Sequence, residues 1–213
     1  MNFKNYKTIS LISFISILAI ICNFLYLWFD EYISNFPELK EISNYIGFLS
    51  ILGLMTLFIE LIDKYLWKQS LTNVIIEIPN LNGRYKGTMT SSYIDPSTNA
   101  PIVLDCVMEI SQTASSIQVH TYIGKDGKQT STSETICEVL KKKSNNFYTL
   151  YYNYGNVSNL NVELNDHKGT AYLDYFKDIK SLKGNYFNER RNSGTIIVKF
   201  VSNVLIGRFN EEL

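Results

Sequence analysis

The sequence predicts a chain of two parts that differ in fold class. An N-terminal two-helix transmembrane hairpin is expected at residues 1–67, a linker at 68–79 and an all-β domain at 80–213. Two observations support this division. The first part holds two long apolar runs, and the second consists of short runs in which apolar and polar residues alternate. We expect the second part to form an eight-stranded up-and-down antiparallel β-barrel.

The two apolar runs have the length that a membrane span requires. Thr8 to Phe29 is 22 residues long without a charge, which gives roughly 33 Å of helix for a hydrocarbon core of about 30 Å. Tyr45 to Ile62 is 18 residues long and has one charge, Glu60. A signal peptide or a buried core helix could look similar, but no A-x-A-like cleavage site follows the first run. We therefore predict spans at about 8–29 and 45–62.

Charges beside the two runs predict how the hairpin is oriented. Lys4 and Lys7 precede the first run and Lys64 and Lys68 follow the second, while the loop between the runs holds four acidic residues and one lysine. Lysines remain on the cytoplasmic side of a membrane. The expected protein is therefore multi-pass with both termini in the cytoplasm.

Eight alternating runs make up the second part. They are expected at residues 82–92, 101–112, 115–123, 130–143, 146–154, 168–176, 180–187 and 193–201. Turn sequences such as "DPSTNAP", "GKDGK" and "NERRNSG" separate several of them. No long helical period interrupts the series, so short connections between neighbouring strands favour a barrel over a sandwich.

The last run leaves one question of orientation open. Its apolar residues Ile196 and Val198 oppose Lys199, but the face of Lys199 also carries Ile197 and Val201. Side chains alternate between the two faces of a strand. This strand is therefore either covered on both sides, or Lys199 points into a cavity.

Composition and motifs argue against several classes of function. Residues 68–213 carry 16 basic and 14 acidic groups, so binding to a DNA or RNA polymer is not favoured. His120 and His167 lack the spacing of metal ligands, and we expect no metal site and no cofactor. "GKDGKQTS" has the wrong spacing for a phosphate loop. No nucleophile, base and oxyanion site can be assembled, so the sequence favours a non-enzyme.

The chain resembles a known family in its whole architecture and in one short motif. Two N-terminal spans, a cytoplasmic barrel and the junction "IPNLNGRYKG" are similar to the two-transmembrane, β-strand-rich effectors of bacterial CBASS anti-phage systems, the CD-NTase-associated membrane effectors. The resemblance implies a barrel that recognises a cyclic dinucleotide made by a partner nucleotidyltransferase. It further implies that the membrane segments disrupt the inner membrane and kill the infected cell.

The candidate ligand contacts follow from the chemistry of a cyclic dinucleotide. Ten of the 15 tyrosines lie after residue 80, and tyrosine rings stack on nucleobases while cations bind phosphates. The candidates for stacking are Tyr85, Tyr151, Tyr172 and Tyr186, and those for phosphate contact are Arg84, Arg191 and Lys199. Core packing of Tyr85 and simple solvation of Arg190 and Arg191 at a turn are the structural alternatives.

Further expectations concern assembly and competing functions. One hairpin cannot line a hole in a membrane, so an active effector is expected to be a homo-oligomer in contact with membrane lipids. A membrane-anchored barrel that binds a lipid or other apolar ligand is the first alternative, and a non-catalytic membrane scaffold is the second. An entirely apolar cavity would favour the former, and a filled barrel would favour the latter.

Overall fold

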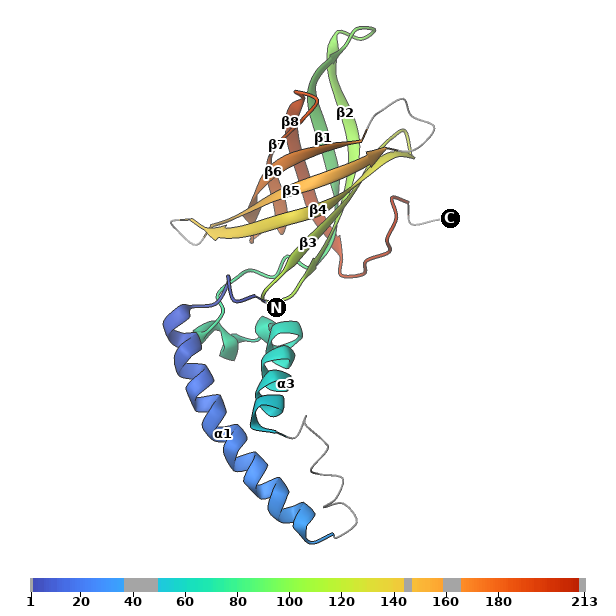
Figure 1. Cartoon of the computed structure of the whole chain (residues 1–213). Coiled ribbons are helices and arrows are strands. Elements are labelled where there is room, and N and C mark those ends of the chain that lie inside the picture. Colours follow the sequence, from blue (N-terminus) through green and yellow to red (C-terminus); the bar gives the residue numbers. More distant parts are fainter. Residues whose placement is uncertain (1, 37–49, 144–146, 159–165, 211–213) are drawn as a thin grey trace. The chain divides into compact units, whose positions relative to one another are not determined.

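The structure is a computed structural model that describes residues 2–36, 50–143, 147–158 and 166–210 of the chain (Figure 1). The chain divides into two compact units. The first comprises Met1–Glu77 with Thr113–Ser115, and the second comprises Ile78–Gln112 with Ser116–Leu213. The first unit is helical, and the second contains the whole sheet.

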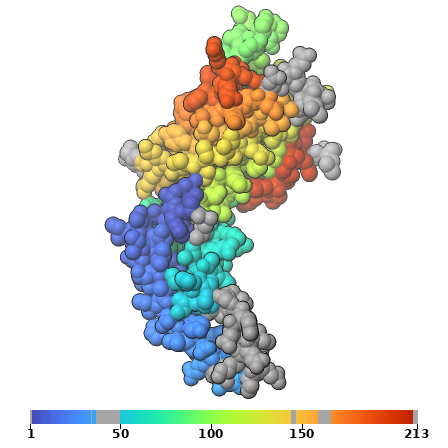
Figure 2. All heavy atoms as spheres, viewed as in Figure 1, coloured from blue at the N-terminus to red at the C-terminus, as the bar shows by residue number. Residues whose placement is uncertain are grey.

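Helix α1 (Thr8–Ser34) matches the first predicted span. It has 27 residues, about 40 Å at the rise of an α-helix, and is the one helix of the described residues that is long and apolar enough to cross a membrane. Large apolar side chains such as Ile9, Phe24 and Trp28 are exposed along this helix, which is drawn in blue in Figure 2. The hydroxyls of Ser13 and Ser16 donate to carbonyls one turn earlier, which satisfies them within the helix.

Helix α3 (Ile51–Lys64) covers part of the second predicted span. Ser50 caps its start by accepting a hydrogen bond from the Gly53 N–H at 3.1 Å, and Lys64 pairs with Glu60 in its last turn. The helix has 14 residues, about 21 Å, which alone is shorter than a hydrocarbon core of about 30 Å. Residues 45–49 lie outside the described residues, so a second span stays a prediction.

Short 3-10 turns follow α3 and complete the helical unit. They are η2 (Leu66–Lys68) and η3 (Ser70–Val74). The segment before α1 pairs with the segment after η3, through a bridge between Tyr6 and Ile76 and a 2.9 Å hydrogen bond from the Lys7 N–H to the Ile75 carbonyl. The two ends of the helical unit are thereby held together.

Eight antiparallel strands form a closed barrel in chain order, with β1 pairing β8, as the sequence predicts (Figure 1). The strands are β1 (Gly83–Asp95), β2 (Ala100–Gln112), β3 (Ile117–Lys125), β4 (Lys128–Lys142), β5 (Tyr148–Ser158), β6 (His167–Phe176), β7 (Ser181–Asn188) and β8 (Ser193–Ser202). Closure leaves no unpaired sheet edge. In an up-and-down barrel, the β1–β2, β3–β4, β5–β6 and β7–β8 connections share one end, which we call the open rim.

The barrel interior is filled at the end opposite the open rim. Leu81, just before β1, is fully buried there together with inward residues such as Met108, Leu150 and Leu182. Tyr85 belongs to this core, where its hydroxyl donates to the Leu81 carbonyl at 2.9 Å. Toward the open rim the apolar filling gives way to a cavity.

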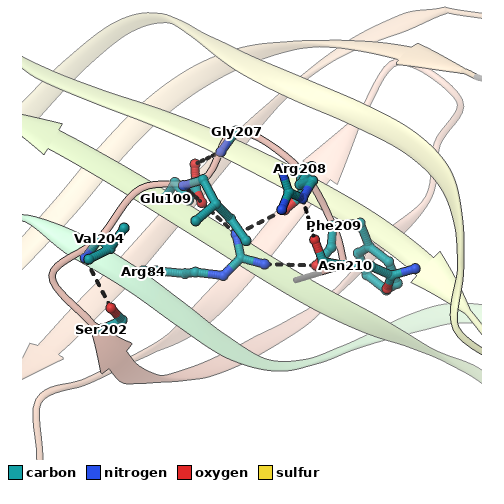
Figure 3. A network of polar contacts seen from close by, with 9 residues as sticks. Arg84, Glu109, Ser202, Val204, Gly207, Arg208, Phe209 and Asn210 are labelled. Carbon is teal, nitrogen blue, oxygen red and sulfur yellow. Dashed lines mark hydrogen bonds and ion pairs between the residues drawn. The ribbon is translucent and has the colours of Figure 1, made fainter. Parts of the chain in front are cut away.

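A C-terminal strap, residues 203–210, lies against the outer face of the barrel (Figure 3). Arg84 and Glu109 form an ion pair on that face, and both are buried because the strap covers them. Glu109 accepts the N–H groups of Ile206 and Gly207 at 2.9 and 3.1 Å. Phe209 packs with Val107 and Tyr122 in a small cluster separate from the main core.

Candidate functional site

A cavity of about 480 Å³ occupies the open-rim half of the barrel. This volume falls within the range of about 300–1,000 Å³ that is typical of small-molecule sites. Its wall is formed by inward side chains from all eight strands and from the β7–β8 turn. The lining residues are Met89, Ser91, Tyr93, Ile102, Leu104, Thr121, Ile123, Lys125, Thr130, Ser131, Ser133, Tyr152, Tyr154, Asn156, His167, Tyr186, Asn188, Arg190, Asn192 and Ile196.

The cavity exists because the inward residues become smaller and more polar toward the open rim. On β4 the inward position in the filled half is Leu140, whereas Ser131 and Ser133 face the cavity. On β5 the inward residue is Leu150 in the filled half and Asn156 at the cavity. Serine side chains cannot fill a barrel cross-section that leucine fills, so space remains.

Three tyrosines supply much of the aromatic wall, and glycines on neighbouring strands make room for two of them. Tyr152 and Tyr154 come from β5 and Tyr186 from β7. A Cβ atom at Gly169 would collide with the Tyr154 ring, and one at Gly194 would collide with the Tyr186 ring. The absence of side chains at these two positions therefore determines where the rings lie.

The cavity tyrosines are held in their neutral form. Burial raises the pKa of Tyr152, Tyr154 and Tyr186 above the ordinary value of a phenol. At neutral pH their rings thus offer stacking surfaces and hydroxyl groups without negative charge. An anionic ligand would meet no repulsion from them.

Cations lie at the open rim of the cavity, and no acidic side chain is among its described lining residues. Lys125 ends β3, and Arg190 lies in the β7–β8 turn. The Nη2 atom of Arg190 is buried and has no hydrogen-bond partner among the described residues. A buried guanidinium nitrogen without a partner is unfavourable by itself, so this position favours a ligand that brings an acceptor, such as a phosphate.

The β7–β8 turn determines which of its two arginines faces the cavity. The Asn188 side-chain oxygen accepts the backbone N–H groups of Arg190 and Asn192 at 3.1 and 3.2 Å. Arg191 adopts a left-handed backbone with φ of 62° and is exposed. Arg190 lines the cavity and Arg191 does not.

Of the seven ligand contacts predicted from sequence, Tyr186 alone lines this cavity. Arg84 lies on the outer face, where its guanidinium bonds Glu109 and the carbonyls of Arg208 and Phe209 (Figure 3). Tyr85 is part of the filled core. These contacts give Arg84 and Tyr85 structural partners.

The other predicted contacts point outward. Tyr151 and Tyr172 are stacked on each other across β5 and β6, with ring centroids 6.2 Å apart, on the face opposite their buried neighbours. Lys199 is exposed on β8, and Ile197 and Val201 beside it are 45% and 49% exposed. The open question about this strand is thus answered: Lys199 points away from the interior.

Sequence reasoning passed over most of the residues that line the cavity. The signal for the serines was the alternation in "TSTSE", residues 130–134, where an inward face has neither large nor apolar side chains. The period of two places Tyr152 and Tyr154 on the same strand face as Leu150, but the sequence does not say which face is inward. Among the described residues, no group of three or more histidine, cysteine, aspartate or glutamate side chains could hold a metal ion.

The cavity lies in the part of the chain that matches a known family. Residues 76–199 match the family model described as Cap15, cyclic dinucleotide receptor domain. The chain is also 30% identical over 141 residues to CD-NTase-associated protein 15 of Yersinia aleksiciae, an alignment that covers 64% of this chain and 62% of that protein. No solved structure gives a significant match. The family expected from the sequence is confirmed: the chain belongs to the Cap15 cyclic dinucleotide receptor domain family.

Proposed function

We propose that the barrel cavity binds a cyclic dinucleotide made by a partner nucleotidyltransferase, and that the chain is a non-enzymatic effector of CBASS anti-phage immunity. The observation that carries this proposal is the cavity itself, whose tyrosines and rim cations all lie inside the region matched by a cyclic dinucleotide receptor family. The name of the Yersinia relative supports the link to a nucleotidyltransferase.

The chemistry of the wall suits this ligand class. A cyclic dinucleotide has two bases, which stack on aromatic rings, and two phosphates, which need cations or N–H donors. Tyr152, Tyr154 and Tyr186 provide neutral rings, while Arg190 and Lys125 provide charge at the rim. Few cations are needed for two phosphates, which agrees with the nearly balanced charge of the barrel sequence.

The two competing functions predict a different interior. A carrier of lipids would have an apolar cavity, but Asn156, Asn188 and Arg190 line this one. A scaffold that binds proteins alone would have a filled barrel. A partly hollow interior, in which polar side chains and an arginine interrupt a largely apolar wall, therefore favours a small charged ligand over both.

Calorimetry with the detergent-solubilised chain and a panel of cyclic dinucleotides tests the binding proposal. Arg190→Ala should weaken binding roughly 10-fold or more, because a hydrogen bond to a charged group is lost. Arg191→Ala removes the same charge from the same turn, yet should leave affinity within about twofold because Arg191 does not line the cavity. Failure of every cyclic dinucleotide to bind, with binding of a fatty acid instead, would show that the barrel is a lipid carrier.

We further propose that bound ligand drives several copies together, and that the gathered N-terminal segments disrupt the bacterial inner membrane. A ligand shifts such an equilibrium only if the bound form associates more favourably than the empty form. Helix α1 supports a membrane location, since many of its apolar side chains are exposed and the hydroxyls of Ser13 and Ser16 are satisfied within the helix. Small residues such as Ser13 and Ser16 would allow close approach of neighbouring copies.

Cell death in this scheme requires both parts of the chain. Co-expression with the partner nucleotidyltransferase should depolarise the inner membrane. Deletion of residues 1–67 should abolish depolarisation while ligand affinity is kept. In detergent, addition of ligand should shift the full chain to larger species. Equal depolarisation without any cyclic dinucleotide would contradict the role of the barrel as a sensor.

The proposed topology is a multi-pass one with both termini in the cytoplasm. It is supported by the lysines that flank the two apolar runs. In intact cells, a membrane-impermeant thiol reagent should label the Ser43→Cys variant and should not label the Lys68→Cys variant. The opposite labelling pattern would invert the topology.

A further inference from the structure

One amide on the cavity wall has no hydrogen-bond partner among the described residues. Asn156, near the end of β5, is 4% exposed and lines the cavity. Its neighbours across the sheet are Ser133 on β4 and His167 on β6. The described residues provide no hydrogen bond to its side chain, although an amide has two donor hydrogens and one acceptor oxygen. Its amide atoms are not among the fully buried atoms that lack a partner, so they are accessible from the cavity, where an occupant can bond to them.

The amide is positioned beside an aromatic surface. Tyr154 precedes it by two residues on β5, so both side chains point inward, about 6.6 Å apart along the strand. The width of a flat ring that stacks on Tyr154 is similar to this spacing. Its edge can therefore meet the Asn156 amide while its face contacts the tyrosine. Enzymes and receptors that bind single bases combine stacking with hydrogen bonds to the base edge in this way.

We propose that Asn156 binds a base edge: its amide pairs with the donor–acceptor edge of one base of the cyclic dinucleotide, and that base stacks on Tyr154. This inference rests on the proposed function. It identifies which of the cavity residues reads a base, whereas the rim cations contact the phosphates.

The chemistry of the four bases makes this role testable. Each base has an adjacent donor and acceptor on its edge, which an amide complements with two hydrogen bonds. A carboxylate has acceptors only. Guanine is the base whose edge presents two adjacent donors, N1–H and N2–H2, so a carboxylate pairs with guanine but repels the ring-nitrogen acceptor of adenine or cytosine and the carbonyl of uracil. Asn156→Asp should therefore change the order of preference among bases.

The experiment compares cyclic di-GMP, cyclic di-AMP, cyclic di-UMP and a mixed purine–pyrimidine cyclic dinucleotide on the full chain in detergent. In Asn156→Asp the affinity for cyclic di-GMP, relative to the adenine and uracil ligands, should rise by roughly 5- to 150-fold, the usual discrimination of a two-bond base contact. Asn153→Asp is the matched control, because Asn153 lies on the same strand but is exposed on the outer face. It adds the same charge and should leave the ratio unchanged.

Two further outcomes separate failure of this inference from failure of the proposed function. Equal weakening of all ligands in Asn156→Asp would overturn the assignment, since charge repulsion from the phosphates would then explain the effect. Binding of none of the panel by the unaltered chain would contradict the proposed function itself. If Asn156→Asp does not fold, Asn156→Leu removes the paired donor and acceptor without a charge and should weaken every ligand of the panel by roughly 5- to 150-fold. Unchanged affinities in that variant would also reject the assignment.

Discussion

Replacement of Arg84 by methionine is expected to destabilise the barrel without a direct effect on ligand affinity. Arg84 is 1% exposed, and its guanidinium bonds Glu109, the Arg208 carbonyl at 2.9 Å and the Phe209 carbonyl at 2.7 Å (Figure 3). Methionine can fill the space of the arginine stem but offers no donor. Glu109 would then remain buried with two backbone N–H partners and no cation.

The magnitude follows from the burial of the pair and of the strap. Removal of one partner from a buried ion pair costs about 3–5 kcal/mol. Release of the strap would expose Phe209, whose burial is worth about 1.5–3 kcal/mol, although part of that packing can persist. With an unfolding entropy typical of a domain of this size, a loss of about 4 kcal/mol lowers the midpoint of thermal unfolding by roughly 10–15 °C.

The assay is thermal and urea unfolding of the chain, followed by the β-sheet signal in circular dichroism. Lys143→Met is the matched control, because Lys143 pairs with Asp174 at the surface, where both side chains are more than 40% exposed, and should cost at most about 1 kcal/mol. A double variant, Arg84→Met with Glu109→Leu, should be less destabilised than Arg84→Met. An unchanged unfolding midpoint in Arg84→Met, together with loss of cyclic dinucleotide binding, would refute the reasoning and make Arg84 a ligand contact.

Three further expectations concern the cavity and the barrel wall. Gly169→Ala should displace the Tyr154 ring and lower ligand affinity, whereas Gly155→Ala, where an added methyl group makes an ordinary contact of 3.9 Å with Ile136, should bind normally in the same calorimetric assay. Burial raises the pKa of Tyr154 above the value of about 10 in an unfolded chain. The contribution of Tyr154 to stability is therefore complete below about pH 10 and is lost as the pH rises toward the folded pKa. A tyrosinate absorbance titration of the native chain that matches free tyrosine would contradict this. Burial also raises the pKa of the Cys106 thiol to about 12, so mass spectrometry after native alkylation should find exposed Cys137 labelled and Cys106 protected.

The sequence by itself determined the order and nature of the elements. Each of the eight alternating runs corresponds to a strand whose ends agree within four residues, because burial of one sheet face imposes a period of two that is visible in the residues. The uncharged run that begins at Thr8 predicted the position of α1, because the length and hydropathy of a segment are local properties of the sequence. Closure of the barrel followed from the number of strands and their short connections.

The tertiary structure alone decided which polar and aromatic residues face the ligand cavity. Tyr151 and Tyr152 are adjacent and chemically identical, yet one stacks on the outer surface and the other lines the cavity. Arg84 has the guanidinium group that is typical of a phosphate contact. In the structure it pairs with Glu109 and with the strap, which lies more than 100 residues later in the sequence. Which arginine of the β7–β8 turn faces inward depends on the hydrogen bonds of Asn188. Each of these outcomes depends on contacts between distant segments and on backbone geometry, which residue type and spacing do not specify.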